Sequence, residues 1–200
     1  MIAKMKHDLD SKGFTLLELV VAMGVMAILG AVLMTQFIHH MDMYVRQKAK
    51  IDTQQKVRTV LMWMEDEFRM AGFNPSFRPL PSHPVLMAEA ETFAFFYRQD
   101  SGDSWKRLDY YMGADGWLRR RDRNGLDNLG SVSRILENAR LNFVYLDRHQ
   151  NAIDSPKEDD YPRIRAVRIE LGASYEDRRG RLGNVDLVTT VKCRNLGIGS

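Results

Sequence analysis

A long apolar run near the N-terminus constrains the fold of this chain more than any other feature. The run extends from Gly13 to Ile38, reads GFTLLELVVAMGVMAILGAVLMTQFI, and contains Glu18 as its only ionisable side chain. About 20 consecutive apolar residues suffice for a helix to cross the hydrocarbon layer of a membrane. A secretory signal has a shorter apolar region, of about 7 to 15 residues, and a small-residue cleavage site after it. The run is longer and no A-x-A pattern follows it, so the sequence favours a retained membrane-spanning helix.

The charge of Glu18 inside this run needs an explanation. A carboxylate within a membrane helix costs roughly 2.5 to 3.5 kcal/mol on insertion scales, so we expect it to have a partner. The alternative is that Glu18, close to the start of the helix, reaches the lipid headgroups and makes no specific contact. The preceding leader, MIAKMKHDLDSKG, is polar and ends in Lys12-Gly13. Processing at that point would leave the apolar helix on the protein.

Residues 12–20, KGFTLLELV, resemble the prepilin signal of type IV pilins and of type II secretion pseudopilins. The resemblance implies that prepilin peptidase cuts between Gly13 and Phe14 and then methylates the new N-terminal residue, Phe14. It also implies that Glu18, at the fifth mature position, pairs with the free N-terminal amine of a neighbouring subunit in a filament. Many major pilins have a helix-kinking proline near the twenty-second mature position. This chain has Thr35 there, so the resemblance gives less support for local unwinding of this helix during assembly.

The same resemblance implies the location of the chain in the cell and its binding partners. The precursor would be a single-pass inner-membrane protein with a cytoplasmic N-terminus and a periplasmic head, and after assembly it would lie in a pilus at the cell surface. The partners implied are prepilin peptidase, other minor and major pilins, and a PilY-type tip adhesin. Charge counting does not set the orientation, because three lysines precede the run and three basic residues, Arg46, Lys48 and Lys50, follow it.

The helical pattern continues beyond the apolar run, with no proline or glycine after Ile38 until Gly72. Its later part carries apolar residues at the spacing of one buried helical face: Val57, Val60, Leu61, Met64, Phe68 and Ala71. Gly72 and the prolines from Pro75 onward predict the end of the helix. We therefore expect a leader (1–13), a membrane-spanning and assembly half of a spine helix (14–38), its second half (39–71) and a β-rich head (72–200).

Several segments of the head read as strands. Thr92 to Arg98, Trp105 to Met112 and Leu141 to Leu146 are rich in aromatic and β-branched residues, and Ala114-Asp115-Gly116 signals a hairpin turn. Alternation marks two further strands, around residues 167–171 and 185–193. The polar segment 149–162 reads as a loop. The expected fold class is α+β and type IV pilin-like, a long spine helix packed on a mostly antiparallel sheet.

Later residues narrow the resemblance. The segments MEDEFRMAGF (64–73), LDYYM (108–112), WLRR (117–120) and ILENARLNFVYL (135–146) are similar to PilW minor pilins and the related PulJ pseudopilins. The ending VKCRNL (191–196) and Ala71-Gly72-Phe73 favour PilW. This implies a minor pilin that contributes to assembly initiation or to a tip complex. The alternatives are a PulJ-like pseudopilin of a type II secretion system, or a membrane-anchored domain that binds DNA, a surface or an adhesin.

Charge and cysteine content restrict other functions. The chain has 29 basic and 26 acidic side chains, a net charge of +3, so any nucleic-acid role has to be local. The basic runs are Arg119 to Arg123 and Arg178 to Arg181; a solvated hairpin is the simpler interpretation and a DNA contact the alternative. The lone Cys193 excludes an intramolecular disulfide, and a buried small residue is its expected role.

We expect no enzyme activity and no cofactor, because the common nucleophile, zinc and phosphate-loop motifs are absent from the sequence. We also expect no metal site. The single acidic cluster offers only weak calcium candidates, which are Asp154, Glu158, Asp159 and Asp160. Oxygen-rich loops can hold calcium, but the EF-hand pattern is missing, so a solvated loop is the simpler interpretation.

Overall fold

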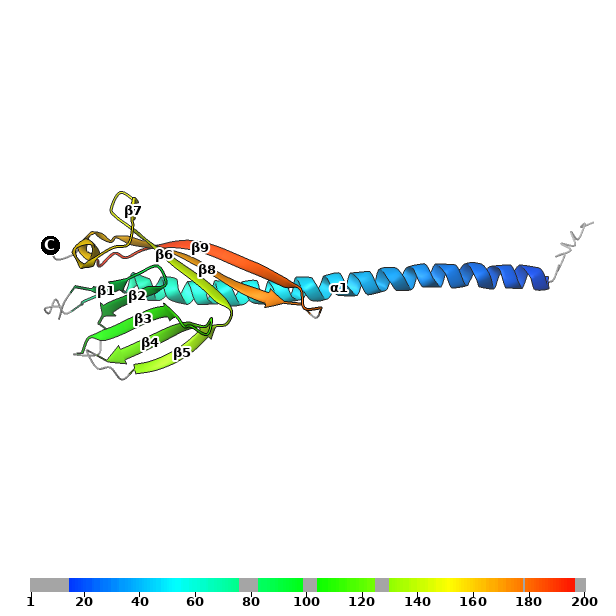
Figure 1. Ribbon diagram of the computed structural model, residues 1–200, viewed down its shortest axis with the longest axis horizontal. Coiled ribbons are helices and arrows are strands. Elements are labelled where there is room, and N and C mark those ends of the chain that lie inside the picture. Colours follow the sequence, from blue (N-terminus) through cyan, green and yellow to red (C-terminus); the bar gives the residue numbers. More distant parts are fainter. Residues whose placement is uncertain (1–14, 76–82, 99–103, 125–129, 178, 197–200) are drawn as a thin grey trace, which may run out of the picture. The chain divides into compact units, whose positions relative to one another are not determined.

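The computed structural model describes residues 15–75, 83–98, 104–124, 130–177 and 179–196. The chain divides into two compact units, one ending at Val45 and the other beginning at Arg46. Helix α1, Leu16–Arg69, contributes to both units (Figure 1). The predicted continuous helix is confirmed over these residues. Its predicted first residue, Phe14, lies outside the described residues.

The predicted helix stop at Gly72 is also confirmed. The last helical residue is Arg69, and a turn over residues 70–72 follows. Gly72 has a φ of 76°, a left-handed conformation that glycine adopts without a steric penalty. A Cβ atom at this position would lie 2.9 Å from the backbone oxygen of Asn195. Both the backbone angle and the close approach of the C-terminal segment therefore require glycine here.

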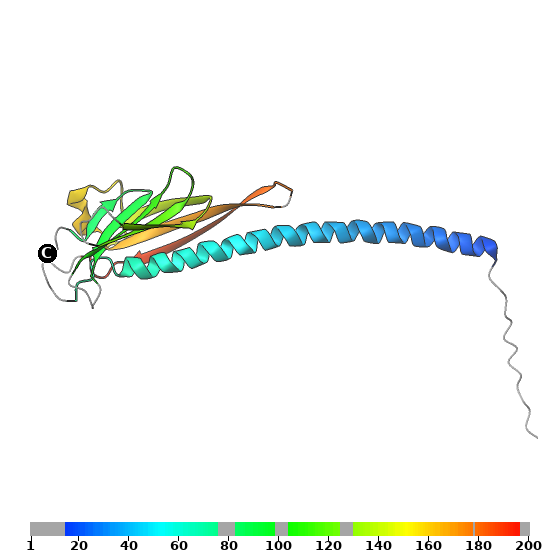
Figure 2. The ribbon, with the colours of Figure 1, turned by 90° about the horizontal axis from the view of Figure 1, so that it is seen from below.

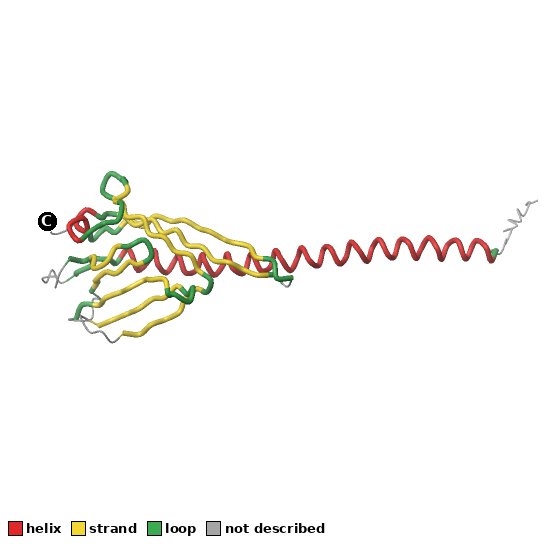
Figure 3. Tube along the Cα trace, viewed as in Figure 1, coloured by secondary structure: helices red, strands yellow, loops and turns green. Residues whose placement is uncertain are grey.

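The second unit contains two antiparallel sheets, drawn in yellow in Figure 3. The five-stranded sheet has the order β1-β2-β3-β4-β5 and consists of β1 (Val85–Ala88), β2 (Thr92–Tyr97), β3 (Lys106–Met112), β4 (Leu118–Asn124) and β5 (Gly130–Leu136). The four-stranded sheet has the order β7-β6-β8-β9 and consists of β6 (Ala139–Leu146), β7 (Ala152–Ile153), β8 (Ala166–Glu176) and β9 (Leu182–Lys192). A 3₁₀ helix, η1 (Glu158–Arg163), precedes β8.

The core of this unit lies between the helix and both sheets. The six residues predicted to form the buried helical face are all buried, and Phe68 is fully enclosed. The Phe68 ring contacts rings from both sheets, with centroid distances of 4.8 Å to Phe93 and 5.7 Å to Phe143. Figure 2 shows both sheets on the same side of the helical part of this unit. One aromatic side chain thus joins all three layers, and full burial of such a ring contributes about 1.5 to 3 kcal/mol.

The fold class is confirmed as α+β and type IV pilin-like, with differences in detail. The strands form two sheets where we expected one, and the predicted loop 149–162 contains the short strand β7 and helix η1. Strand β5 was missed because its sequence, GSVSRIL, is polar and largely exposed and shows no apolar alternation.

Cys193 is buried as predicted, and burial raises the pKa of its thiol to about 12.

Candidate functional site

The start of helix α1 is the first candidate site, and Thr15 defines it. The Thr15 hydroxyl accepts a hydrogen bond from the backbone N–H of Glu18 at 3.2 Å, as an N-cap residue does. Glu18 therefore lies in the first turn, where a negative charge is favoured by the helix dipole. The T-x-x-E spacing of a capping box is the sequence signal that could have predicted this cap. Gly13 and Phe14, the predicted cleavage and methylation residues, lie outside the described residues.

The apolar part of α1 carries no protein cover within its own unit. Leu16 is 82% exposed, and the stretch long and apolar enough to cross a membrane has no buried residue. A Cβ atom on Gly24 or Gly30 would meet nothing within 4 Å. The helix continues through Thr35, whose hydroxyl donates to the carbonyl of Ala31 at 2.9 Å. Such a surface is stable only in lipid or against other apolar helices.

In the second unit, helix α1 also has an uncovered apolar side. Met62 and Trp63 are 59% and 57% exposed, although Leu61 and Met64 on either side of them are buried. Ile51 is exposed in the same unit. Large apolar side chains on the side of a helix away from its own domain indicate a surface for another protein. The apolar spacing in the sequence predicted the buried side of this helix and gave no indication of this second side.

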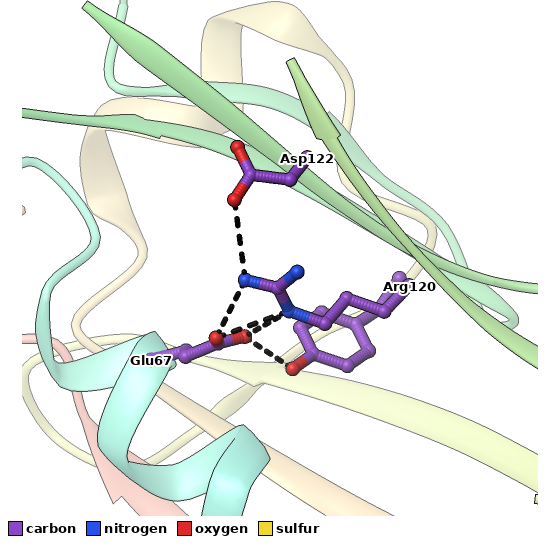
Figure 4. A network of polar contacts seen from close by, with 4 residues as sticks. Glu67, Arg120 and Asp122 are labelled. Carbon is purple, nitrogen blue, oxygen red and sulfur yellow. Dashed lines mark hydrogen bonds and ion pairs between the residues drawn. The ribbon is translucent and has the colours of Figure 1, made fainter. Parts of the chain in front are cut away.

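A polar network attaches the end of helix α1 to the five-stranded sheet (Figure 4). The single Nε–H of Arg120 donates a bifurcated hydrogen bond to both carboxylate oxygens of Glu67 on the helix, each at 3.0 Å, and Arg120 Nη2 donates to Glu67 Oε1 at 2.8 Å. Glu67 also accepts a hydrogen bond from the Tyr110 hydroxyl. Asp122 contacts Arg120 Nη2 at 3.4 Å from the same strand. The four side chains hold the helix at a fixed position over β3 and β4.

The network is partly shielded from water, which strengthens its electrostatics. The Glu67 and Arg120 side chains are 21% and 23% exposed. Burial, followed by the charge of Glu67 and the hydrogen bond to it, raises the pKa of Tyr110. Burial alone would lower the pKa of Arg120, but the hydrogen bond to Glu67 and its charge outweigh that effect and raise it. Tyr110 therefore stays protonated as a donor, and Arg120 stays charged.

A second set of contacts lies at the two segments whose resemblance favours PilW over PulJ. Asn195 Nδ2 donates to the backbone oxygen of Arg69 at 3.2 Å and so satisfies a carbonyl at the end of the helix. The N–H of Gly72 donates to the Phe96 carbonyl at 2.8 Å, and Leu196 is buried. Ala71-Gly72-Phe73 and Arg194-Asn195-Leu196 thus form one structure, which we call the helix-end clasp.

The weak calcium candidates are not brought together. Asp160 accepts a hydrogen bond from the backbone N–H of Lys157 and forms an ion pair with Arg163 at 3.0 Å. Glu158 and Asp159 are exposed on η1, and Asp154 lies outside that helix. Within the residues that the structure describes, no group of three or more acidic, histidine or cysteine side chains has the geometry of a metal site.

The basic run on β4 divides between the two faces of the sheet. Arg120 points toward Glu67 on the helix, so the flanking Arg119 and Arg121 point the opposite way. The run lies on a hairpin, as expected, but these side chains are only partly exposed and have protein contacts, so they are less solvated than expected. In the second basic run, Arg181 pairs with the buried Asp177 at 2.7 Å. Arg178 lies outside the described residues.

Comparisons with known proteins bear on the N-terminal site and the fold. Residues 9–34 match the prokaryotic N-terminal methylation motif. The chain is 29% identical over 134 residues to the pilin-like protein PilA3 of Thermus thermophilus, a match that covers 60% of this chain. The match spans 57% of the relative's length. No solved structure matches the chain.

The fold and the N-terminal segment together define a class of α+β proteins with an N-terminal helix that is long and apolar enough to cross a membrane and carries a methylation motif. Within that class, the methylation motif and the PilA3 match make the chain similar to pilin-like proteins, and they support the type IV pilin family. The sequence-based recognition of a prepilin family is therefore confirmed, because both the motif and the pilin-like relative support it.

Proposed function

We propose that this protein is a minor pilin of the PilW type that is cleaved after Gly13, methylated at Phe14 and incorporated into a type IV pilus. Its activity is assembly and not catalysis. The observation that carries the proposal is the exposed apolar helix, which begins one residue after the Thr15 cap and has Glu18 in its first turn. Cleavage before Phe14 creates a free amine, which is the positive partner that a carboxylate in an apolar surrounding needs.

The proposal gives Glu18 a role between subunits. The Glu18 backbone N–H is already bound to Thr15, whereas its carboxylate is exposed and available to another chain. In the filament, this carboxylate pairs with the methylated amine of Phe14 on a neighbouring subunit. The uncovered Met62 and Trp63 extend the subunit contact along the helix, where they bury apolar area against other pilins.

The PilW assignment rests on the helix-end clasp. Its two halves, around Gly72 and Asn195, are far apart in the sequence and carry the PilW-like residues. Because these halves pack against each other, the PilW-like residues share one structural role at the end of the helix. We place the protein in the complex that initiates pilus assembly or forms the pilus tip. Before assembly it spans the inner membrane with the head in the periplasm. Prepilin peptidase, minor and major pilins and a PilY-type adhesin are its proposed partners.

Substitutions at Glu18 test whether assembly needs its negative charge or only a polar side chain at this position. Glu18→Ala removes both the charge and the side chain, whereas Glu18→Gln keeps an amide that suits the first helical turn and removes only the charge. We expect both variants to be cleaved, and both to be depleted at least about tenfold from sheared pili, because a neutral side chain cannot pair with the amine. Glu137→Ala, at an exposed position of the head, is the matched control and should be incorporated normally. Normal incorporation of Glu18→Gln would contradict the proposed ion pair.

Deletion of the gene tests the initiation role against the alternatives. The proposal predicts few or no pili per cell, with recovery on complementation by the wild-type chain. Normal pili together with a block in the secretion of exoproteins would identify a PulJ-like pseudopilin. Normal pili with a loss of surface attachment only would identify a binding subunit. Either of these results would contradict the initiation role.

A further inference from the structure

A set of arginines on the five-stranded sheet has no part in the function proposed above. Strands β3, β4 and β5 direct the following side chains away from helix α1, and we call this surface the arginine face: Arg107, Arg119, Arg121, Arg123 and Arg134. The register places Arg107 opposite Arg123 and Arg119 opposite Arg134. Like charges directly opposite each other on neighbouring strands are destabilising, so their concentration here calls for a compensating cause.

Two carboxylates hold these opposed pairs in place. Asp109 is buried and contacts Arg107 Nε at 2.6 Å and Arg123 Nη2 at 3.4 Å. Asp115, in the β3–β4 turn, contacts Arg119 Nη2 at 2.6 Å and Arg134 Nη2 at 3.7 Å. Each acid is therefore shared by two arginines. Five positive and two negative side chains leave three net positive charges on a fixed scaffold, although the chain as a whole has a net charge of only +3.

Several N–H donors on this face remain unused. The Nε atoms of Arg119 and Arg123 are buried and have no hydrogen-bond partner among the described residues. Arg121 forms no ion pair in the part of the chain that the structure describes; it donates to the Tyr111 hydroxyl at 2.8 Å. The two Nε atoms are enclosed and cannot reach an external ligand. Arg121, which has no ion pair among the described residues, is the cation of this face that is left to bind an external acceptor.

Aromatic rings accompany the arginines. The Arg121 guanidinium lies 4.9 Å from the centre of the Tyr111 ring, and that of Arg134 lies 5.8 Å from the centre of the Trp117 ring. Both rings are partly exposed. Along β4 the outward arginines recur at every second residue, a repeat of about 6.8 Å. A linear row of guanidinium groups beside aromatic rings suits a chain of phosphates that carries planar bases.

We propose that the arginine face binds the phosphodiester backbone of a nucleic acid. Arg121 and Arg134 make the phosphate contacts that are easiest to remove, because neither is the sole partner of a carboxylate. Arg107 and Arg123 keep Asp109 paired and so maintain the scaffold. This inference does not depend on the role of the protein in filament assembly, since it concerns only the head.

The test uses the full mature chain in nanodiscs of zwitterionic lipid and measures the fluorescence anisotropy of a labelled single-stranded oligonucleotide and of its duplex. We expect wild-type binding to weaken steeply between about 50 and 200 mM salt. The double variant Arg121→Gln/Arg134→Gln should bind at least about tenfold more weakly, with a salt slope for the duplex reduced by about 2. The matched control, Arg140→Gln/Arg194→Gln, removes the same charge from exposed positions outside this face and should bind like the wild type.

Three results would overturn the proposal. One is the absence of binding by the wild type at about 50 mM salt, where electrostatic association is strong. Another is an equal loss of affinity in the control variant, which would mean a general charge effect. The third is displacement of the oligonucleotide by polyglutamate at equal charge concentration, which would mean that the face accepts any acidic polymer, including a protein. Thermal melting by circular dichroism verifies that each variant is folded.

Discussion

Two different constraints act on Gly72, and they can be measured separately. An L-amino acid in the left-handed conformation costs roughly 1 to 2 kcal/mol, and a Cβ atom here would also press on the Asn195 backbone. We predict that Gly72→Ala lowers the free energy of unfolding by about 2 to 3 kcal/mol, measured by urea denaturation of the mature chain in detergent. Gly116→Ala is the matched control, because Gly116 has a similar φ of 75° but open space around it. Equal losses in the two variants would contradict the tight clasp.

The Glu67 carboxylate is the central acceptor of its network, so its charge should matter for stability. Replacing it with an amide weakens the contacts with Arg120 and leaves that partly shielded guanidinium with Asp122, at 3.4 Å, as its remaining charged partner. We predict that Glu67→Gln costs about 2 kcal/mol, a value reduced for the partial exposure of the pair. Asp66→Asn on the adjacent exposed position should change stability by less than about 0.5 kcal/mol. Similar melting midpoints for the two variants would mean that the network does not hold the helix.

At the scale of single elements, the β8–β9 turn should respond to acid. Asp177 is buried and accepts hydrogen bonds from the backbone N–H groups of Arg179 and Arg181 and from Arg181 Nε. Burial alone would raise the pKa of this carboxyl, but these hydrogen bonds and the charge of Arg181 lower it below the ordinary value of 3.8. The stabilisation is therefore fully present above the unfolded pKa and is lost as pH falls through the lower folded pKa.

We predict that Asp177→Asn unfolds at lower temperature than the wild type at pH 6 to 7, and that the difference shrinks as pH falls below about 4. Thermal denaturation over this pH range measures the difference. Hydrogen exchange of the Arg179 and Arg181 amides locates the effect at the turn. A difference in melting temperature that stays constant down to acid pH would contradict the assigned charge interaction.

The elements also differ in how far the sequence could predict them. Helix α1 was predictable because its apolar spacing and its glycine stop are local signals. The residues at the predicted apolar positions, from Val57 through Phe68, are buried as expected, whereas Met62 and Trp63 between them are not. Strand β5 carries no such signal, since most of its residues are exposed. It is a strand because it pairs with β4. The division into two sheets likewise depends on contacts between distant segments. These are settled by packing around Phe68 and not by local propensity.

The candidate sites follow the same rule. The N-terminal methylation motif was predictable because its residues are contiguous in the sequence, and the roles of Gly13, Phe14 and Glu18 stay predictions. The Glu67–Arg120 network was not, because its partners are 53 residues apart and meet only once the register of β4 is known. The arginine face likewise depends on that register, although the alternation of side chains along a strand indicated that the basic run would divide.

At the scale of the whole molecule, the protein has two surfaces of different chemistry. The first unit presents an apolar helix that requires lipid or neighbouring helices, and the second unit is a folded head with its own core. In our proposals, filament assembly uses the apolar side of helix α1, including Met62 and Trp63, and nucleic-acid recognition uses the arginine face of the head. Loss of the Glu18 charge should therefore change incorporation into the filament without changing nucleic-acid binding by the head.

The central claim is that the chain becomes a subunit only after cleavage before Phe14. Mass spectrometry of the N-terminal peptide, prepared separately from membranes and from sheared pili, tests it most directly. We predict uncut and cut chains in the membrane fraction, and in the pili only a peptide that begins at Phe14 with a methylated amine. A chain in the pili that still begins at Met1, or the absence of the cut peptide from both fractions, would contradict the claim.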